Sequence, residues 1–425
     1  MTMRFLVTLI LLTVVGRGAR TQITPTESEK QLWTAVGEFG HLLLKVTSEQ
    51  MKRQDNVLIS PFSVHTALSM VVPGARGLTK EEMVRTLHSG RIAPGGLQNV
   101  FSQITGRKQR NTTTAGQVFP DLQFTVILAN RLYAQKKYAF APGYVDDLKS
   151  TFHADAVNVD FSNGGAVQNE INDFVRQKTN NLIPKVLQQP LNENTVMVLV
   201  NTLYFKGDWQ KKMSKKNLAL TFNKGCEGLE KPQDKWLAVT NRMPYLESAN
   251  LGAKLVQIPY KSREFSARML IVMPSDENNC NAKEWLEKLQ WSSLREEINK
   301  MKTTNVALTM PPFEMRYRAE IHNVLPTMGM SQVFKRGEAD LSGMVTDPKE
   351  RLNIDQIIHE TKMIVTAYGT EAAAVTALTI TRLSIRPSLD PVPMTVDRSF
   401  YVAILYGKHN VTEVLPLFVG VVHNV

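Results

Sequence analysis

The chain has 425 residues, of which 43% are hydrophobic and 21% are charged, as is ordinary for a globular protein with a large core. Its formal net charge of +11 favours anionic partners, although the basic residues are scattered, as on a solvated surface. The composition excludes a disulfide-rich scaffold, because Cys226 and Cys280 are the only cysteines, and a disulfide between them is left open.

The first nineteen residues are typical of a secretion signal. A short basic start precedes the apolar run Phe5–Val15, and small residues follow it. The run is too short to span a bilayer, so a membrane anchor is not expected. The sequence therefore predicts a secreted protein, with cleavage after Gly18 or Ala19 and a mature chain that covers residues 20–425.

Helices are predicted mainly in the first half of the chain. The hydrophobic period indicates four of them: Ser28–Gln50, Ser63–Val72, Leu97–Thr105 and Ala166–Lys178. The second is ended by Pro73 and Gly74. In the fourth, Ile171, Phe174 and Val175 are expected to face inward.

Strands are predicted mainly in the second half. Thr195–Phe205 is a near-continuous apolar run of β-formers, as expected of a central strand that is buried on both faces. Further strands are expected at Met269–Met273, Val306–Met310, Phe400–Tyr406 and Leu415–Val422, the last two paired around the polar turn His409–Asn410. This order predicts an α+β fold with large sheets and no clear domain boundary.

The segment Gly369–Ser384 changes character halfway. Its first half is small and alanine-rich, which favours helix, and its second half is β-branched, which favours strand. A segment with two tolerable conformations is what a conformational switch needs. An Ala-rich helix end followed by a loop is the plainer alternative.

Six separated motifs give the chain a family resemblance. In order they are NVLISPFS (56–63), NTLYFKGDW (201–209), MPPF (310–313), ADLSG (339–343), GTEAAA (369–374) and VDRSFY (396–401). Together they closely resemble the serpin family, from about Ser28 to the C-terminus. The resemblance implies a single domain with three β-sheets, eight or nine helices and an exposed reactive-centre loop at about 367–392.

The resemblance also implies an activity. A serine protease would cleave the loop and form an acyl-enzyme, and the N-terminal part of the loop would then insert into the large sheet and trap the protease. The chain would thus be a monomeric inhibitor rather than an enzyme, and its partner would be the protease in a covalent complex. No cofactor, metal, nucleic acid or membrane partner is expected.

The side chains of the hinge show whether it could insert as a strand, because alternate residues of a strand lie on opposite faces. In a strand, one face would carry only small side chains, those of Thr370, Ala372, Ala374 and Thr376, as a face buried beneath a sheet requires. The hinge glycine is Gly369, and Glu371, Ala373 and Val375 would lie on the other face. The preceding Ala367 and Tyr368 depart from the acidic residues usual in the family. This departure leaves the speed of insertion open, and with it a non-inhibitory role as carrier or chaperone.

By similarity to inhibitory members, the scissile bond lies fourteen residues after the hinge glycine, at Leu383–Ser384. A leucine suits the hydrophobic primary pocket of chymotrypsin-like or elastase-like proteases. Arg382 is the competing residue, for a trypsin-like target, and Arg386 is a weaker third candidate.

Four residues match the family's buried hydrogen-bonded shutter beneath the large sheet: Ser60, Ser63, Asn201 and His359. Serine with histidine also suggests a hydrolase, but the chain has no GxSxG elbow or aligned acid. We expect the four residues to satisfy one another and to regulate opening of the sheet.

The basic run Arg107, Lys108 and Arg110 falls where related serpins place a helix that can bind heparin, so heparin or another glycosaminoglycan is a candidate partner. A solvated helix end is the alternative. Asn111 and Asn410 are N-glycosylation sequons, in agreement with a secreted protein.

Overall fold

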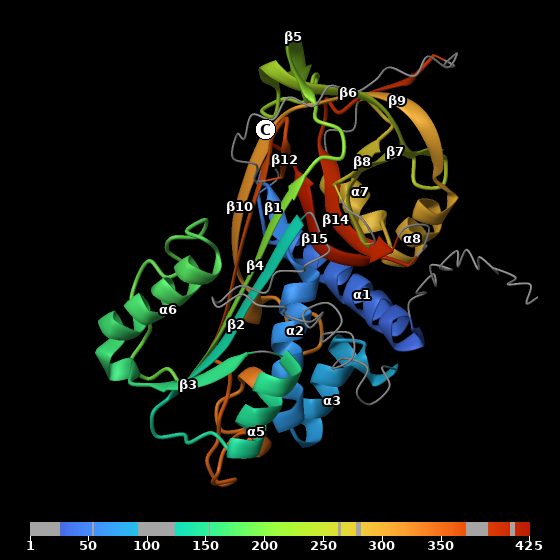
Figure 1. Ribbon diagram of the computed structural model, residues 1–425. Coiled ribbons are helices and arrows are strands. Elements are labelled where there is room, and N and C mark those ends of the chain that lie inside the picture. Colours follow the sequence, from blue (N-terminus) through green and yellow to red (C-terminus); the bar gives the residue numbers. More distant parts are fainter. Residues whose placement is uncertain are drawn as a thin grey trace, which may run out of the picture.

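The computed structural model describes residues 26–52, 55–91, 124–152, 154–261, 265–277, 282–370, 390–408 and 413–425. These residues form two β-sheets with helices packed around them (Figure 1). The predicted signal segment, the predicted helix Leu97–Thr105 and the turn His409–Asn410 lie outside the described residues.

One sheet has six strands in the order β10-β11-β12-β4-β2-β3. Its strands are β2 (Phe124–Gln135), β3 (Asp155–Val159), β4 (Met197–Asp208), β10 (Phe313–Glu320), β11 (Gln356–Val365) and β12 (Gly369–Thr370). The predicted central strand is confirmed as β4. Leu199 and Leu203 pack into one core cluster, and Val198 and Val200 pack into another on the opposite face.

The second sheet has nine strands: β1 (Val57–Ile59), β5 (Ser214–Phe222), β6 (Lys231–Ser248), β7 (Ala253–Pro259), β8 (Phe265–Pro274), β9 (Lys302–Met310), β13 (Val392–Thr395), β14 (Phe400–Lys408) and β15 (Leu415–Val422). Strand β6 is 18 residues long. It pairs with β5 and β9 along most of its length and with β7 at its end, so it joins two smaller sheets into one hydrogen-bonded network. Two of the three expected sheets are therefore continuous at β6, and the six-stranded sheet is the third. The predicted pair at the C-terminus is confirmed, because β14 and β15 are antiparallel.

Seven α-helices of the expected eight or nine fall within the described part of the chain: α1 (Glu27–Glu49), α2 (Pro61–Val71), α3 (Gly77–Thr86), α5 (Pro142–Asp147), α6 (Gly164–Lys178), α7 (Ala282–Lys288) and α8 (Trp291–Lys300). Single helical turns also occur at Val72–Gly74, Ser89–Arg91, Leu148–Phe152, Phe161–Asn163, Ile321–Asn323, Gln332–Phe334 and Ser342–Met344. Local signals set two of the starts. Thr26 and Glu29 form a capping box on α1, and Ser60 caps α2 ahead of Pro61.

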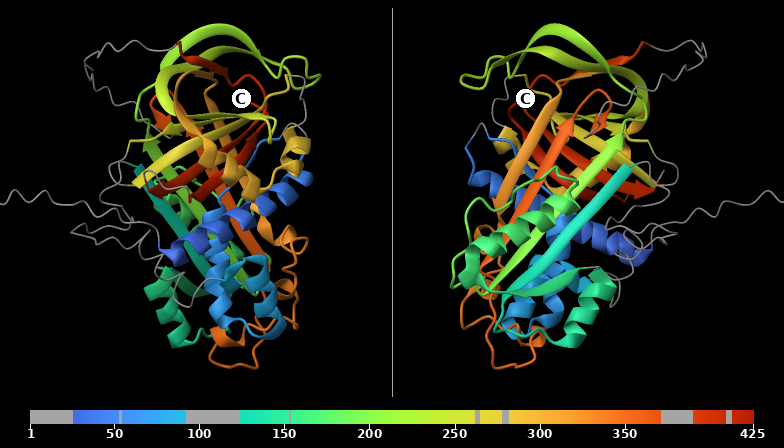
Figure 2. Two further views of the ribbon diagram at one scale, coloured as in Figure 1. Left: turned by 90° about the vertical axis from the view of Figure 1, so that its right-hand side faces the viewer. Right: turned by 60° about the vertical axis from the view of Figure 1, so that its left-hand side comes forward.

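Helices cover both faces of the six-stranded sheet. Helix α6 lies across one face, over β2 and β4 (Figure 2), and its inward residues Ile171, Phe174 and Val175 are buried as predicted. Helix α2 packs against β4 and β15 on the other side, and α1 packs against β15 and α2. None of the described helices is long and apolar enough to cross a membrane.

The turn between β5 and β6 contains Cys226, which is buried and disulfide-bonded. The sequence left this question open. The other cysteine, Cys280, lies outside the described residues.

Candidate functional site

The six-stranded sheet is open at one end, between β4 and β11. Lower down these two strands pair directly and in parallel, from Gln356↔Val198 to Thr361↔Leu203. Above this stretch the short strand β12 occupies the space between them. Thr370 is the partner of Val365 on β11 and of Gly207 on β4, antiparallel to both. Strand β12 thus lies in the seam between β4 and β11 as far as Thr370, where the described part of this segment ends.

The turn that leads into β12 is fixed by backbone hydrogen bonds. Within the turn, Thr366 donates its N–H to Gly369 O at 2.9 Å. From the neighbouring segment, Trp209 donates its N–H to Tyr368 O and Met213 donates its N–H to Ala367 O, both at 2.9 Å, while Trp209 Nε1 donates to Thr366 O at 2.9 Å. Ala367 and Tyr368, which depart from the family pattern, therefore contribute their carbonyls to holding the turn.

The glycine at position 369 is required by its surroundings. A Cβ atom on Gly369 would lie 2.1 Å from Gly207 O and 2.8 Å from Asp208 Cα. Both of these contacts are with backbone, which cannot rotate away. Only glycine allows β12 to lie this close to β4.

A buried hydroxyl pair fixes the residue after this glycine. Tyr260 Oη and Thr370 Oγ1 lie 2.5 Å apart, and both residues are about 1% exposed. The Tyr260 ring stacks on Trp209 with a centroid distance of 4.5 Å. Burial raises the pKa of Tyr260 above its ordinary value, and the hydrogen bond to Thr370 partly opposes this. Tyr260 is therefore a neutral hydrogen-bonding group at this site.

The four shutter residues predicted from the sequence lie together directly below, on the seam itself. His359 on β11 faces Asn201 on β4, and His359 Nδ1 donates to Asn201 Oδ1 at 2.6 Å. The Ser60 N–H donates to His359 Nε2 at 3.0 Å, and Asn201 Nδ2 lies 2.6 Å from Ser63 Oγ. All four residues are 0% exposed. They tie the N-terminus of α2 to both strands that border the seam.

Burial keeps the imidazole of His359 neutral. It lowers the pKa of His359 to about 3, and the hydrogen bond to Asn201 opposes this only in part. Because one ring nitrogen donates to Asn201 and the other accepts from the backbone N–H of Ser60, neither contacts a serine hydroxyl. This geometry gives His359 a structural role rather than that of a general base.

Sequence reasoning missed a fifth member of this cluster, Asn130 on β2. Its Oδ1 accepts from Asn201 Nδ2 at 2.6 Å. A lone amide within the apolar strand VILANRLY was the available signal, because a buried polar side chain needs a partner. Tyr260 and Trp209 were also missed as partners of the hinge.

Several predicted site residues lie outside the described residues. They are the bait residues Leu383, Ser384, Arg382 and Arg386, the hinge residues Glu371, Ala372, Ala373, Ala374, Val375 and Thr376, the basic residues Arg107, Lys108 and Arg110, and the sequons Asn111 and Asn410. Across the described ranges, no group of three or more His, Cys, Asp or Glu residues could hold a metal ion.

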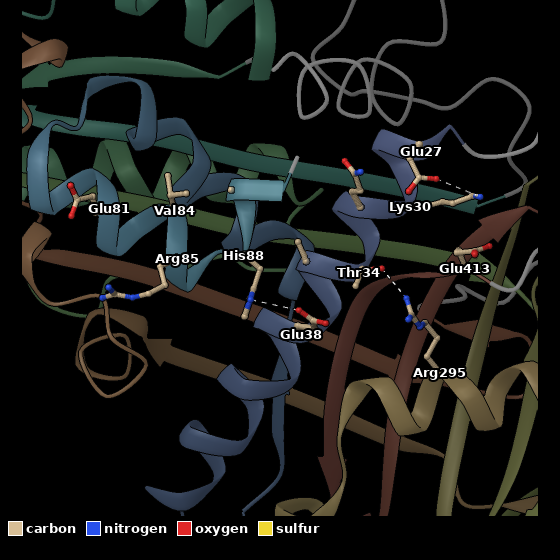
Figure 3. Close-up of a pocket in the computed structure, with 13 residues that line it drawn as sticks. Glu27, Lys30, Thr34, Glu38, Glu81, Val84, Arg85, His88, Arg295 and Glu413 are labelled. Atoms are coloured by element: carbon tan, nitrogen blue, oxygen red, sulfur yellow. Dashed lines mark hydrogen bonds and ion pairs between the residues drawn. The ribbon is translucent and has the colours of Figure 1, made fainter. Parts of the chain in front are cut away.

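A separate pocket of about 750 Å³ lies between α1, α3 and α8 (Figure 3). In its lining, His88 Nδ1 lies 3.6 Å from Glu38 Oε2, and Arg295 donates to Thr34 Oγ1 at 2.8 Å. Its other charged lining residues are Glu27, Lys30, Glu81, Arg85 and Glu413. The mixed charge suits a polar ligand better than an apolar one.

The family model for serpins (serine protease inhibitors) matches residues 34–425. A leukocyte elastase inhibitor of Xenopus tropicalis is 32% identical over 329 residues, which cover 76% of this chain and 82% of that protein. Its horse counterpart is 30% identical over 400 residues and covers 92% of this chain and 98% of its own length. Human thyroxine-binding globulin superposes with a TM-score of 0.77 at 23% identity, over 93% of this chain and 99% of that one, which supports the fold alone.

Proposed function

This chain belongs to the serpin family, and we propose that it inhibits a serine protease by suicide trapping. In this mechanism the protease cleaves the reactive loop, remains attached as an acyl-enzyme, and is carried across the molecule as the loop inserts between β4 and β11. The position of β12, already seated at the entrance to that seam, is the observation that carries the proposal.

The register of β12 supports insertion in one particular frame. Each step beyond Thr370 moves one residue back along both β11 and β4. Continued in this way, the loop would place Ala372 opposite Met363 and Phe205, Ala374 opposite Thr361 and Leu203, and Thr376 opposite His359 and Asn201. In the present structure β11 and β4 pair directly, with His359 opposite Asn201. The inserted strand would lie between the same two residues, so the register of β11 relative to β4 would not change. The two strands would separate without sliding.

The same frame agrees with the small-residue face of the hinge. The six residues that would flank Ala372, Ala374 and Thr376 are all buried, at 2% exposure or less. Thr370, on the same face, already contacts buried Tyr260. An inserted residue on this face would have to fit among buried side chains, so small residues are expected there. Ala372, Ala374 and Thr376 meet this requirement.

Insertion also has an energetic basis. A strand of about a dozen residues adds backbone hydrogen bonds at roughly 1 kcal/mol net each. The release is thus on the order of 10 kcal/mol, comparable to the whole stability of a domain. The form with the loop outside the sheet would then be a metastable state held by a kinetic barrier.

For the bait we propose the bond Leu383–Ser384, with a chymotrypsin-like or elastase-like target. Arg382 remains the alternative for a trypsin-like target, and Arg386 the third. Incubation with chymotrypsin and with trypsin separately should give an SDS-resistant complex with one of them. The mass of the released C-terminal peptide identifies the bond. Cleavage by both enzymes with no complex would refute trapping.

The pocket between α1, α3 and α8 favours one alternative, a non-inhibitory carrier. The solved thyroxine-binding globulin shares the fold. Because the lining here has charges of both signs, it suits a ligand that carries charged groups of its own, as the amino acid thyroxine does. Thyroxine is a suitable probe. A rise in thermal midpoint with thyroxine, together with an absence of protease complexes, would favour the carrier.

Secretion and monomeric state are part of the same proposal. The N-terminal sequence of protein recovered from culture medium tests cleavage near Gly18 or Ala19, and sedimentation of the purified protein tests the monomer.

A further inference from the structure

A buried carboxylate, that of Glu360, lies directly beside the seam. Glu360 is opposite Thr202 on β4, and its side chain is 2% exposed. It lies two residues after Ile358, which packs in the core cluster under α6, so both side chains are on the face of the sheet that α6 covers. Arg316 on β10 neutralises the carboxylate, because its Nε and Nη2 lie 2.7 and 2.6 Å from Glu360 Oε1. Both partners belong to the β10–β11 side of the seam, so this ion pair does not require the seam to be closed.

The guanidinium of Arg316 makes a second contact, with the chain that follows α6. Arg316 Nη2 donates to Lys185 O at 3.3 Å. Lys185 is part of residues 179–191, which we call the linker. Within the described part of the chain, this is the one hydrogen bond that joins β10 or β11 to the linker.

The peptide group between Lys185 and Val186 is held from two sides. Its carbonyl accepts from Arg316 on β10, and its N–H donates to Asn172 Oδ1 on α6 at 2.8 Å. Asn172 also accepts from the N–H of Leu187 at 2.8 Å and donates to Leu187 O at 3.0 Å. A single peptide group of the linker therefore connects α6 with β10.

The packing of the linker indicates which side of the seam it would follow. Its buried side chains share a core cluster with α6, β2 and β4, and Ile358 is the described residue that β11 contributes. We therefore expect the linker to stay with β2 and β4 when the seam opens. An inserted strand would move β10 and β11 away by about 4.8 Å. The 3.3 Å contact between Arg316 and Lys185 would not survive this displacement.

We infer that the hydrogen bond from Arg316 to Lys185 O, which we call the clasp, sets the rate at which the seam opens. This inference rests on the proposed insertion of the loop, because the clasp resists that step. The backbone of an inserted strand would restore the pairing of both β4 and β11. The clasp is lost without such a replacement, whereas the pair of Arg316 and Glu360 is kept. Arg316 is thus a positioning residue that acts on insertion through the linker.

The test variant is R316M/E360M, which removes the clasp together with the buried ion pair. Replacing both members of a buried pair by apolar residues is often neutral for stability, whereas removing one member is strongly destabilising. The matched control is K362M/E314M. It removes the other described ion pair between β10 and β11, Lys362 Nζ to Glu314 Oε1 at 2.9 Å, which makes no described hydrogen bond to the linker. A second control, E360Q, keeps an acceptor for Arg316 and hence the clasp.

The first measurement is uptake of a synthetic peptide with the sequence of residues 371–380, which continues the strand from Thr370 and needs no protease. A labelled peptide that enters the sheet remains with the protein on native gels. R316M/E360M should take it up about fivefold faster than the wild type, the factor that corresponds to one net hydrogen bond. K362M/E314M and E360Q should stay within about twofold of the wild type. Equal acceleration in K362M/E314M, or none in R316M/E360M, would refute the clasp.

The second measurement does not depend on insertion. Amide exchange at Val186, whose N–H belongs to the clasped peptide group, should be about fivefold faster in R316M/E360M and unchanged in K362M/E314M. Unchanged exchange at Val186 in R316M/E360M would refute the clasp alone. Failure of the wild type to take up the peptide would instead refute insertion between β4 and β11, and with it the proposed function.

Discussion

The hydroxyl groups of Tyr260 and Thr370 lie 2.5 Å apart in the core, although 110 positions separate the two residues in sequence. This contact fixes the first residues of the hinge inside the sheet. Thr370 therefore lies within the seam between β4 and β11, as a partner of both strands.

Tyr260→Phe should loosen this anchor. The substitution leaves the buried Thr370 hydroxyl without its partner, which costs about 1–3 kcal/mol. We expect a lower thermal midpoint at fixed scan rate and faster amide exchange at Thr370. Tyr401→Phe is the matched control, because Tyr401 Oη is buried without a hydrogen-bond partner among the described residues. Equal effects of the two substitutions would contradict the anchor.

Gly369→Ala should displace β12 from the sheet. The added methyl group meets the backbone of Gly207 and Asp208, and such overpacking costs about 1–3 kcal/mol. Hydrogen exchange should show loss of protection at Thr370. Gly165→Ala in α6, where an added Cβ meets nothing within 4 Å, should leave the stability unchanged or slightly raised. Retained protection in Gly369→Ala would show that β12 tolerates a side chain.

Asn201→Ala should favour opening of the seam. Asn201 contacts His359, Ser63 and Asn130, so its loss leaves several buried groups unpaired. We expect more polymer or latent monomer on native gels after mild heating, as also for His359→Ala. Asn172→Ala removes a buried amide of α6 that binds the backbone of Val186 and Leu187, away from the seam, and should destabilise the fold without this increase. Unchanged polymerisation in Asn201→Ala would argue against the shutter role.

Stability should decrease as the pH falls from about 6.5 to 4. Burial lowers the pKa of His359 to about 3 and those of His41 and His65 to about 4. The unfolded chain therefore binds more protons than the folded chain in this interval, and folding becomes less favourable as the pH drops. Burial also lowers the pKa of His322, which acts in the same direction. Burial of Glu360 raises its pKa and acts in the opposite direction, as a single group against four histidines.

His41→Gln isolates one of these contributions. Glutamine can still donate to Leu289 O, the partner of His41 Nε2, but it does not titrate. The dependence of unfolding free energy on pH should become shallower by up to about 1.4 kcal/mol per pH unit between pH 4 and 6.5. An unchanged pH dependence in urea unfolding would show that His41 is protonated equally in both states.

The sequence allowed the main elements and the shutter to be predicted because their signals are local. The apolar run of β4 and the amphipathic period of α6 reflect burial directly. Ser60, Ser63 and Asn201 lie in motifs, and His359 was assigned with them through the family resemblance. The partners of the hinge could not be predicted in this way. Tyr260 and Trp209 reach it only through the tertiary fold, and nothing in the residues around them indicates that contact.

The continuity of the second sheet was also beyond sequence reasoning. The length of β6 depends on partners that come both before and after it, namely β5 and β9.

The most direct test of the account compares two arginine substitutions in the hinge. Ala374→Arg would place a charge on the face that the β12 register directs toward buried Thr361 and Leu203, whereas Ala373→Arg would place it on the outer face. With the protease that forms the wild-type complex, we predict that Ala373→Arg still gives an SDS-resistant complex and that Ala374→Arg is cleaved without one. A stable complex with Ala374→Arg, or no complex with the wild type, would contradict insertion between β4 and β11.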